Sequence, residues 1–167
     1  MTALLPLVVD PATDLVFERI VEVPPELVWR AWTVAKDLMR WFTPAPWTTV
    51  ACDIELRPGG MFRTVMRSPE GQEFTNLGSY LEVVPNERLI WTTALGPGFR
   101  PAGARPAESI DIVFTAAISL ARHAKGARYT AHAMHPDSAS RERHAQMGFE
   151  QGWGKALEQL VGVAKTF

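Results

Sequence analysis

The sequence predicts a single α+β domain, in which an antiparallel sheet of about seven strands packs against a long C-terminal helix. Three observations lead to this fold class. Apolar and polar residues alternate in short segments separated by turn residues, which is typical of strands with one buried face. After residue 47 these segments follow one another directly, and short turns favour antiparallel neighbours. At the end of the chain, apolar residues instead recur at spacings of three and four, which indicates a helix.

The first third of the chain predicts one strand and two short helices. Residues 14–23, DLVFERIVEV, alternate in character and stop at Pro24 and Pro25, so they are expected to form the first strand. Pro25 suits the first turn of a helix, and residues 36–41 predict a second short helix. Residues 1–13 are expected to be a flexible tail, which leaves residues 14–167 as the domain.

The rest of the chain predicts six strands and one helix. The strands are expected at 47–56, 61–67, 74–84, 88–95, 109–120 and 127–135, and a helix is expected over 138–164. A proline- and glycine-rich segment at 96–108 separates two of the strands. Its length fits either a lid over a binding site or a simple long connection.

Composition excludes several classes of protein. Of 167 residues, 17 are basic and 18 acidic, a net charge of −1 that provides no strong field for nucleic acid or an anionic membrane. Cys52 is the single cysteine, so an intrachain disulfide is impossible and a reducing compartment fits best. The apolar N-terminal stretch lacks a basic flank and is too short for a signal or membrane segment. We therefore expect a cytoplasmic protein with neither nucleic-acid nor membrane partners.

Three glycines lie in the middle of the predicted C-terminal helix: Gly148, Gly152 and Gly154. Each glycine inside a helix costs about 0.5–1 kcal/mol relative to alanine, so a compensating role is expected. Small residues on one face could let the helix approach the sheet closely. Alternatively, they could leave a void above the sheet, rimmed by Met147 and Trp153, in which an apolar ligand binds.

Four segments resemble a known family. VEVPPELVWRAWTVAKDLMRWF, DIELRPGGMFRTVM, GSYLEVVPNERLIWT and MGFEQGWGKALEQL, in this order, are similar to landmarks of the activator of heat-shock-protein-ninety ATPase homologue family, within the START-like (SRPBCC) superfamily. The resemblance spans residues 15–161. It implies a helix-grip fold, in which a curved sheet of seven strands holds the C-terminal helix and encloses a deep cavity. It implies no single activity and supplies no catalytic motif.

Strand alternation suggests which side chains would line such a cavity. Arg63 and Arg67 belong in water, so Phe62 and Met66 on the same strand are expected to face inward. In the strand 127–135 both faces are compatible with burial, and we favour an inward Tyr129 while retaining His132 as a polar candidate. The predicted lining is Trp41, Phe62, Met66, Trp91, Phe114, Tyr129, His132, Met147 and Trp153.

Polar candidates for chemistry are few. An inward His132 could orient a ligand or act as an acid or base, although a lone histidine on a strand is more often solvated or hydrogen-bonded. The other histidines lie at expected turns or helix ends and are predicted to be exposed: His123, His135 and His144. Three carboxylates without an evident partner complete the set: Glu73, Glu108 and Asp111. No HxxxH or HExxH spacing occurs, so neither a metal nor another cofactor is expected.

Three functions remain open. The favoured hypothesis is a protein that binds a small hydrophobic or aromatic molecule in the cavity. The first alternative is an enzyme similar to polyketide cyclases or hydrolases, which would use an inward polar group such as His132 or Tyr129; catalysis itself is undecided. The second alternative is co-chaperone-like stimulation of a heat-shock ATPase. A homodimer is compatible with each of these.

Overall fold

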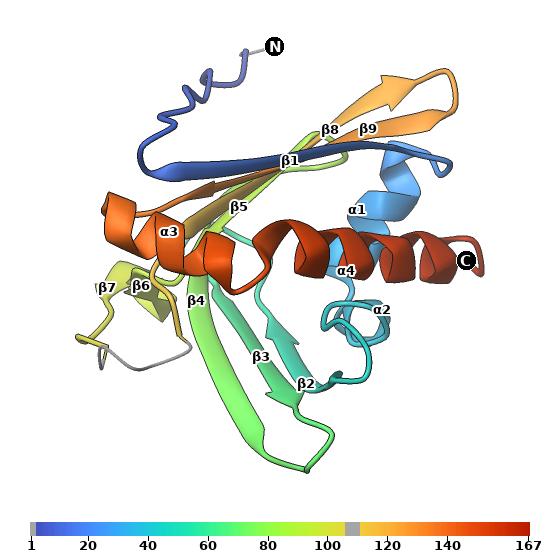
Figure 1. Ribbon diagram of the computed structural model, residues 1–167. Coiled ribbons are helices and arrows are strands. Elements are labelled where there is room, and N and C mark those ends of the chain that lie inside the picture. The colour runs from blue at the N-terminus through green and yellow to red at the C-terminus, as the bar shows by residue number, and fades with distance from the viewer. Residues whose placement is uncertain (1–2, 106–110) are drawn as a thin grey trace.

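A seven-stranded antiparallel sheet forms the body of the protein in the computed structural model, which describes residues 3–105 and 111–167. The spatial strand order is β1-β9-β8-β5-β4-β3-β2 (Figure 1). The strands are β1 (Asp14–Val21), β2 (Thr48–Ile54), β3 (Met61–Arg67), β4 (Glu73–Val84), β5 (Arg88–Thr92), β8 (Thr115–His123) and β9 (Gly126–Met134). This arrangement confirms the predicted α+β class and the helix-grip fold.

The helices lie at one end and across one face of the sheet. They are α1 (Pro25–Thr33), α2 (Ala35–Leu38), α3 (Ser138–Gln146) and α4 (Phe149–Ala164). Figure 1 shows α4 crossing the sheet, with α1 and α2 beside its C-terminal half. The apolar stripe of α4, which includes Phe149, Leu157 and Leu160, is buried against the sheet. This stripe, rather than helix propensity alone, stabilises α4.

The predicted single helix over 138–164 is wrong, because the chain forms two helices joined at Gly148. Gly148 has a φ of 89°, in the left-handed region that glycine adopts without steric cost. Its backbone N–H bonds to the carbonyl of Ala145 at 3.1 Å, which ends α3, and its own carbonyl accepts from Gly152 at 2.8 Å, which starts α4. The polar sequence of α3 buries no residue, so α3 and α4 pack differently.

Two predicted strands differ from the structure by three residues or more at an end. The expected strand at 88–95 ends at Thr92, because Leu95–Gly96 (β6) leaves the sheet and pairs with Arg100–Pro101 (β7), with the 3₁₀ turn η1 (Pro97–Phe99) between them. The expected strand at 109–120 begins only at Thr115, and residues 109–110 lie outside the described residues.

Before β1, residues 3–13 form neither a helix nor a strand. The carbonyl of Leu5 nevertheless accepts a hydrogen bond from Nη1 of Arg88 on β5 at 2.7 Å. The boundary at residue 14 and the flexibility of the tail remain predictions.

Aromatic side chains dominate the core between the helices and the sheet. Trp32 of α1 lies edge-on to Trp41, with ring centroids 4.8 Å apart, and 5.0 Å from Trp91 of β5. Trp41 also donates a hydrogen bond from Nε1 to the carbonyl of Ala31 at 3.0 Å, so its one polar atom is satisfied. This cluster holds α1 and α2 at the end of the sheet and forms the inner wall of the site described next.

Candidate functional site

A pocket of about 610 Å³ lies between α4 and the sheet. This volume is in the range of small-molecule sites, roughly 300–1,000 Å³. Eight of the nine side chains that the sequence predicted for the lining contribute to it. The sheet supplies Phe62, Met66, Trp91, Phe114 and Tyr129. Trp41 follows α2, Met147 follows α3, and Trp153 belongs to α4. That these residues bind a ligand remains a prediction.

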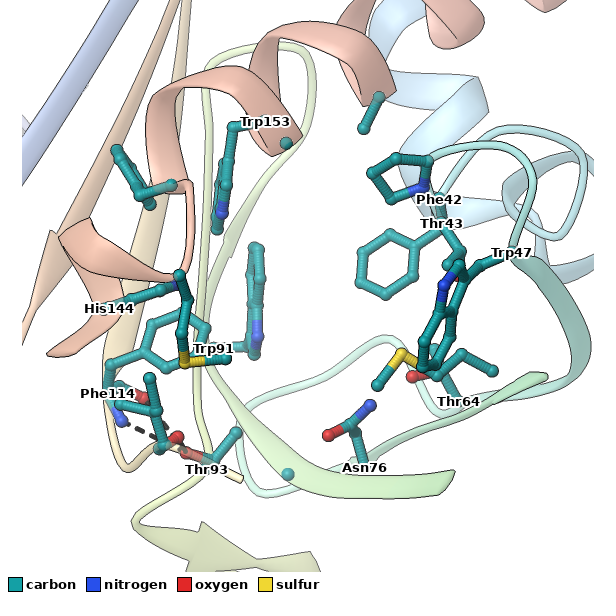
Figure 2. A pocket seen from close by; sticks show the side chains of 18 of the residues that line it. Phe42, Thr43, Trp47, Thr64, Asn76, Trp91, Thr93, Phe114, His144 and Trp153 are labelled. Atoms are coloured by element: carbon teal, nitrogen blue, oxygen red, sulfur yellow. Dashed lines mark hydrogen bonds between the residues drawn. The ribbon is translucent and has the colours of Figure 1, made fainter. Parts of the chain in front are cut away.

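The pocket has a flat aromatic wall. The indoles of Trp91 and Trp153 are nearly parallel, with an interplanar angle of 7° and centroids 6.4 Å apart. Figure 2 shows these two rings on one side of the pocket and Phe42 and Trp47 on the other. Phe42 and Trp47 were absent from the predicted lining. Both lie in the irregular segment between α2 and β2, although a strand had been expected to begin at Trp47. Opposed aromatic surfaces suit a flat apolar guest.

Gly152 leaves open space on the pocket side of α4. It lines the pocket, and a Cβ atom built on it would meet no other atom within 4 Å. Of the two roles considered for the glycines, close approach to the sheet or a void above it, the void is the one found at this position. Gly154 faces Phe17 instead, where an added Cβ would lie 3.6 Å from the ring, an ordinary van der Waals contact.

We expect Gly152→Ala to raise the free energy of unfolding by about 0.5–1 kcal/mol, because alanine loses less backbone entropy in a helix. The matched control is Gly162→Ala in the same helix, where an added Cβ also meets no atom within 4 Å, away from the pocket. Urea unfolding of both variants measures the effect. A loss of stability only at position 152 would mean that the space beside it is filled.

The predicted inward placement of His132 is wrong. Tyr129, Ala131 and Ala133 face the core, so alternation turns His132 to the opposite face of β9. There it is buried, and its Nε2 lies 2.7 Å from Oδ2 of Asp14 on β1. His132 is therefore a structural hydrogen-bonding residue outside the pocket.

Two histidines expected to be exposed are instead paired beside the pocket. His135 is buried, with Nδ1 2.8 Å from the carbonyl oxygen of Thr13. Its Nε2 lies 2.8 Å from Nδ1 of His144, and His144 lines the pocket beside Phe114 (Figure 2). The pair was not predicted, because both histidines were expected to be exposed at turns or helix ends, and the sequence pattern gave no sign that α3 ends before Gly148.

Both histidines favour the neutral form. Burial lowers the pKa of His144 to about 4, and the neighbouring His135 adds to this shift. Burial also lowers the pKa of His135, although the Thr13 carbonyl and the carboxylates of Asp14 and Asp137 partly oppose that change. At neutral pH the pocket therefore contains a neutral imidazole.

The three carboxylates singled out in the sequence have different surroundings. Asp111 lines the pocket and accepts a hydrogen bond from Nε of Arg105 at 2.8 Å. Glu73 pairs with Arg67 at the surface, and Glu108 lies outside the described residues. Within residues 3–105 and 111–167, no group of three or more His, Cys, Asp or Glu side chains is placed to hold a metal ion. None of the helices described has the length and apolar character needed to cross a membrane.

A seven-stranded sheet that holds a C-terminal helix across an apolar pocket defines a START-like helix-grip protein. The chain belongs to the family described as activator of Hsp90 ATPase homolog 1-like protein, whose model matches residues 22–165.

Solved structures agree with this assignment. A crystal structure of a Nitrosomonas europaea protein is 44% identical, with a TM-score of 0.88, over 95% of this chain and 97% of that one. A Chromobacterium violaceum protein is 23% identical, with a TM-score of 0.72, over 91% and 96% of the two chains. A Rhodobacter sphaeroides protein is 21% identical, with a TM-score of 0.78, over 93% and 94%. The last two show the fold alone. No curated protein matches the chain.

Proposed function

We propose that this protein is a receptor for a small, flat, apolar or aromatic molecule that binds between α4 and the sheet. The observation that carries the proposal is the parallel pair Trp91 and Trp153, which gives a 610 Å³ pocket a flat aromatic wall. Stacking on such a wall and burial of apolar area would together supply affinity.

Access to the pocket supports the same proposal. Met147, one of its lining residues, is 53% exposed to solvent. Methionine is flexible and polarisable, so Met147 can adapt to guests of different outline. A guest could therefore enter beside Met147 without unfolding of the sheet.

Catalysis has weaker support. The enzyme alternative required an inward polar group at His132 or Tyr129, and His132 lies on the opposite face of the sheet. Tyr129 lines the pocket, but burial raises the pKa of its hydroxyl, which disfavours the phenolate needed for a base.

Filling the pocket tests the receptor proposal. We expect N-phenyl-1-naphthylamine, a neutral fluorescent probe, to bind the wild-type protein saturably with a micromolar dissociation constant. Gly152→Trp should weaken this binding at least about tenfold, because an indole at this position would occupy the guest's space. Gly162→Trp is the matched control, since Gly162 is an exposed residue of the same helix. Non-saturable binding to the folded wild type, or equal binding by both variants, would contradict the proposal.

A further inference from the structure

The pair His135–His144 places at the pocket wall a ring nitrogen that can only accept a hydrogen bond. A carbonyl oxygen can only accept a hydrogen bond, so the contact of Thr13 with Nδ1 of His135 requires a proton on that nitrogen. A neutral His135 then has a bare Nε2, which must accept. The nitrogen 2.8 Å away, Nδ1 of His144, is therefore the donor.

This direction of hydrogen bonding determines the tautomer of His144. A neutral imidazole carries one proton, and in His144 that proton is on Nδ1. Its Nε2 consequently presents a lone pair. Among the described residues no hydrogen bond to this nitrogen is found, whereas Nδ1 of His144 and both ring nitrogens of His135 each have a partner. His144 lines the pocket and His135 does not, so Nε2 is the ring nitrogen left for a guest.

The aromatic surroundings hold the His144 ring in this position. Its centroid lies 5.0 Å from that of Phe114 and 5.1 Å from that of Phe149, which packs edge-on at 76°. Figure 2 shows His144 next to Phe114 on the same side of the pocket as Trp91 and Trp153. An aromatic guest stacked on the two indoles would therefore place its edge near this imidazole.

We propose that the pocket selects aromatic guests that carry a hydroxyl group, and that the hydroxyl donates a hydrogen bond to Nε2 of His144. This inference rests on the proposed receptor function and adds the chemical class of the guest. A carboxylate or an ether offers only acceptors to the same lone pair and leaves it unmatched.

His144 is suited to accept a hydrogen bond rather than to remove a proton. An effective general base has a pKa near the pH at which it works. Burial holds the pKa of His144 at about 4, so its lone pair is too weakly basic to ionise a phenol at neutral pH. The hydroxyl is bound with its proton retained.

Matched probes test the inference: 2-naphthol and its methyl ether, 2-methoxynaphthalene. Their dissociation constants are measured at pH 7.5 by quenching of tryptophan fluorescence. We expect the wild type to prefer the naphthol by roughly three- to tenfold, the effect of one hydrogen bond. In His144→Phe the ratio should fall to about one, because phenylalanine cannot accept a hydrogen bond.

A ratio near one in the wild type, or a preserved preference in the variant, would overturn the inference while leaving the receptor function standing. Absence of binding by both probes would instead overturn the receptor function and the inference with it.

A second measurement needs neither a ligand nor a variant that folds. The ¹⁵N shifts of the imidazole nitrogens in the unliganded wild type report which nitrogen of His144 carries the proton. We expect Nδ1–H at His144 and Nδ1–H at His135, as the two 2.8 Å contacts require. A proton on Nε2 of His144 would remove the acceptor from the pocket and overturn the proposal.

Discussion

Replacing Asp14 with alanine is expected to lower the free energy of unfolding by about 3 kcal/mol, because three hydrogen bonds end on its buried carboxylate. Oδ2 accepts from the backbone N–H of Asp10 at 3.0 Å and lies 2.7 Å from Nε2 of His132, while Oδ1 accepts from the hydroxyl of Thr13 at 2.9 Å. Burial raises the pKa of the carboxyl, but the hydrogen bonds outweigh it and leave the pKa below its ordinary value. The carboxylate is thus ionised at neutral pH, and its loss leaves His132 buried without a partner.

Two variants on β1 show whether the buried carboxylate causes the loss. Asp14→Asn keeps the shape and one acceptor oxygen, so its cost should be smaller than that of Asp14→Ala. Glu18 is the control, since its ion pair with Arg128 at 3.8 Å is exposed and should contribute less than about 1 kcal/mol. Urea unfolding at pH 7.5 measures the free energy of unfolding of Asp14→Ala, Asp14→Asn and Glu18→Ala. Equal effects of Asp14→Ala and Glu18→Ala would show that burial adds nothing to this interaction.

Coupling to His132 separates the pair from the other bonds of the carboxylate. Once Asp14 is alanine, the further change His132→Ala should cost less than it does in the wild type, because the partner is already lost. Additive effects of the two substitutions would show that the 2.7 Å contact contributes little.

The sheet was predictable because its strands carry clear local patterns. Arg63 and Arg67 alternate with inward side chains, and this alternation was enough to place Phe62 and Met66 in the pocket lining. The pairs β2–β3, β3–β4, β4–β5 and β8–β9 followed from short turns, which leave few topologies open. The pairs β5–β8 and β1–β9 join segments that are far apart in the sequence. The family resemblance likewise implied a sheet of seven strands with a cavity beside it.

The polar part of the site was not predictable from the same patterns. A glycine inside an apolar helical pattern gives no sign of its φ angle, so the joint at Gly148 was missed and with it the position of His144. Similarly, His132 is buried on the outer face of β9, between the half-buried Thr130 and Met134, and the sequence alternation did not separate this face from the inner one. Its partner Asp14 is 118 residues away, and only the strand pairing brings the two together.

The histidine pair also makes stability depend on pH. The pKa of His144 is about 4 in the folded protein and has an ordinary value of 6.5. Between these values the unfolded chain binds more protons than the folded one, so stability falls as the pH falls. The contribution of His144 is fully present above about pH 6.5 and is progressively lost toward pH 4. The lowered pKa of His135 acts in the same direction.

We expect the free energy of unfolding of the wild type to drop by about 2 kcal/mol between pH 7.5 and pH 5.0, at about 1.4 kcal/mol for each pH unit below 6.5. In His144→Phe this drop should be reduced by more than half, because the variant has no imidazole to protonate there. Gly162→Ala serves as the control, since it changes helix stability without removing a titratable group and should keep the wild-type pH dependence.

The pH window distinguishes the histidines from the carboxylates. Asp14 has a lowered pKa in the folded protein, so its contribution is present above its ordinary value of 3.8 and is lost only as the pH falls below that value. The decline between pH 6.5 and 5.0 therefore reports on the imidazoles. If His144→Phe lost stability over this interval as steeply as the wild type, the pKa of His144 would not be lowered on folding. The conclusion that its lone pair is too weakly basic to remove a proton would then have to be abandoned.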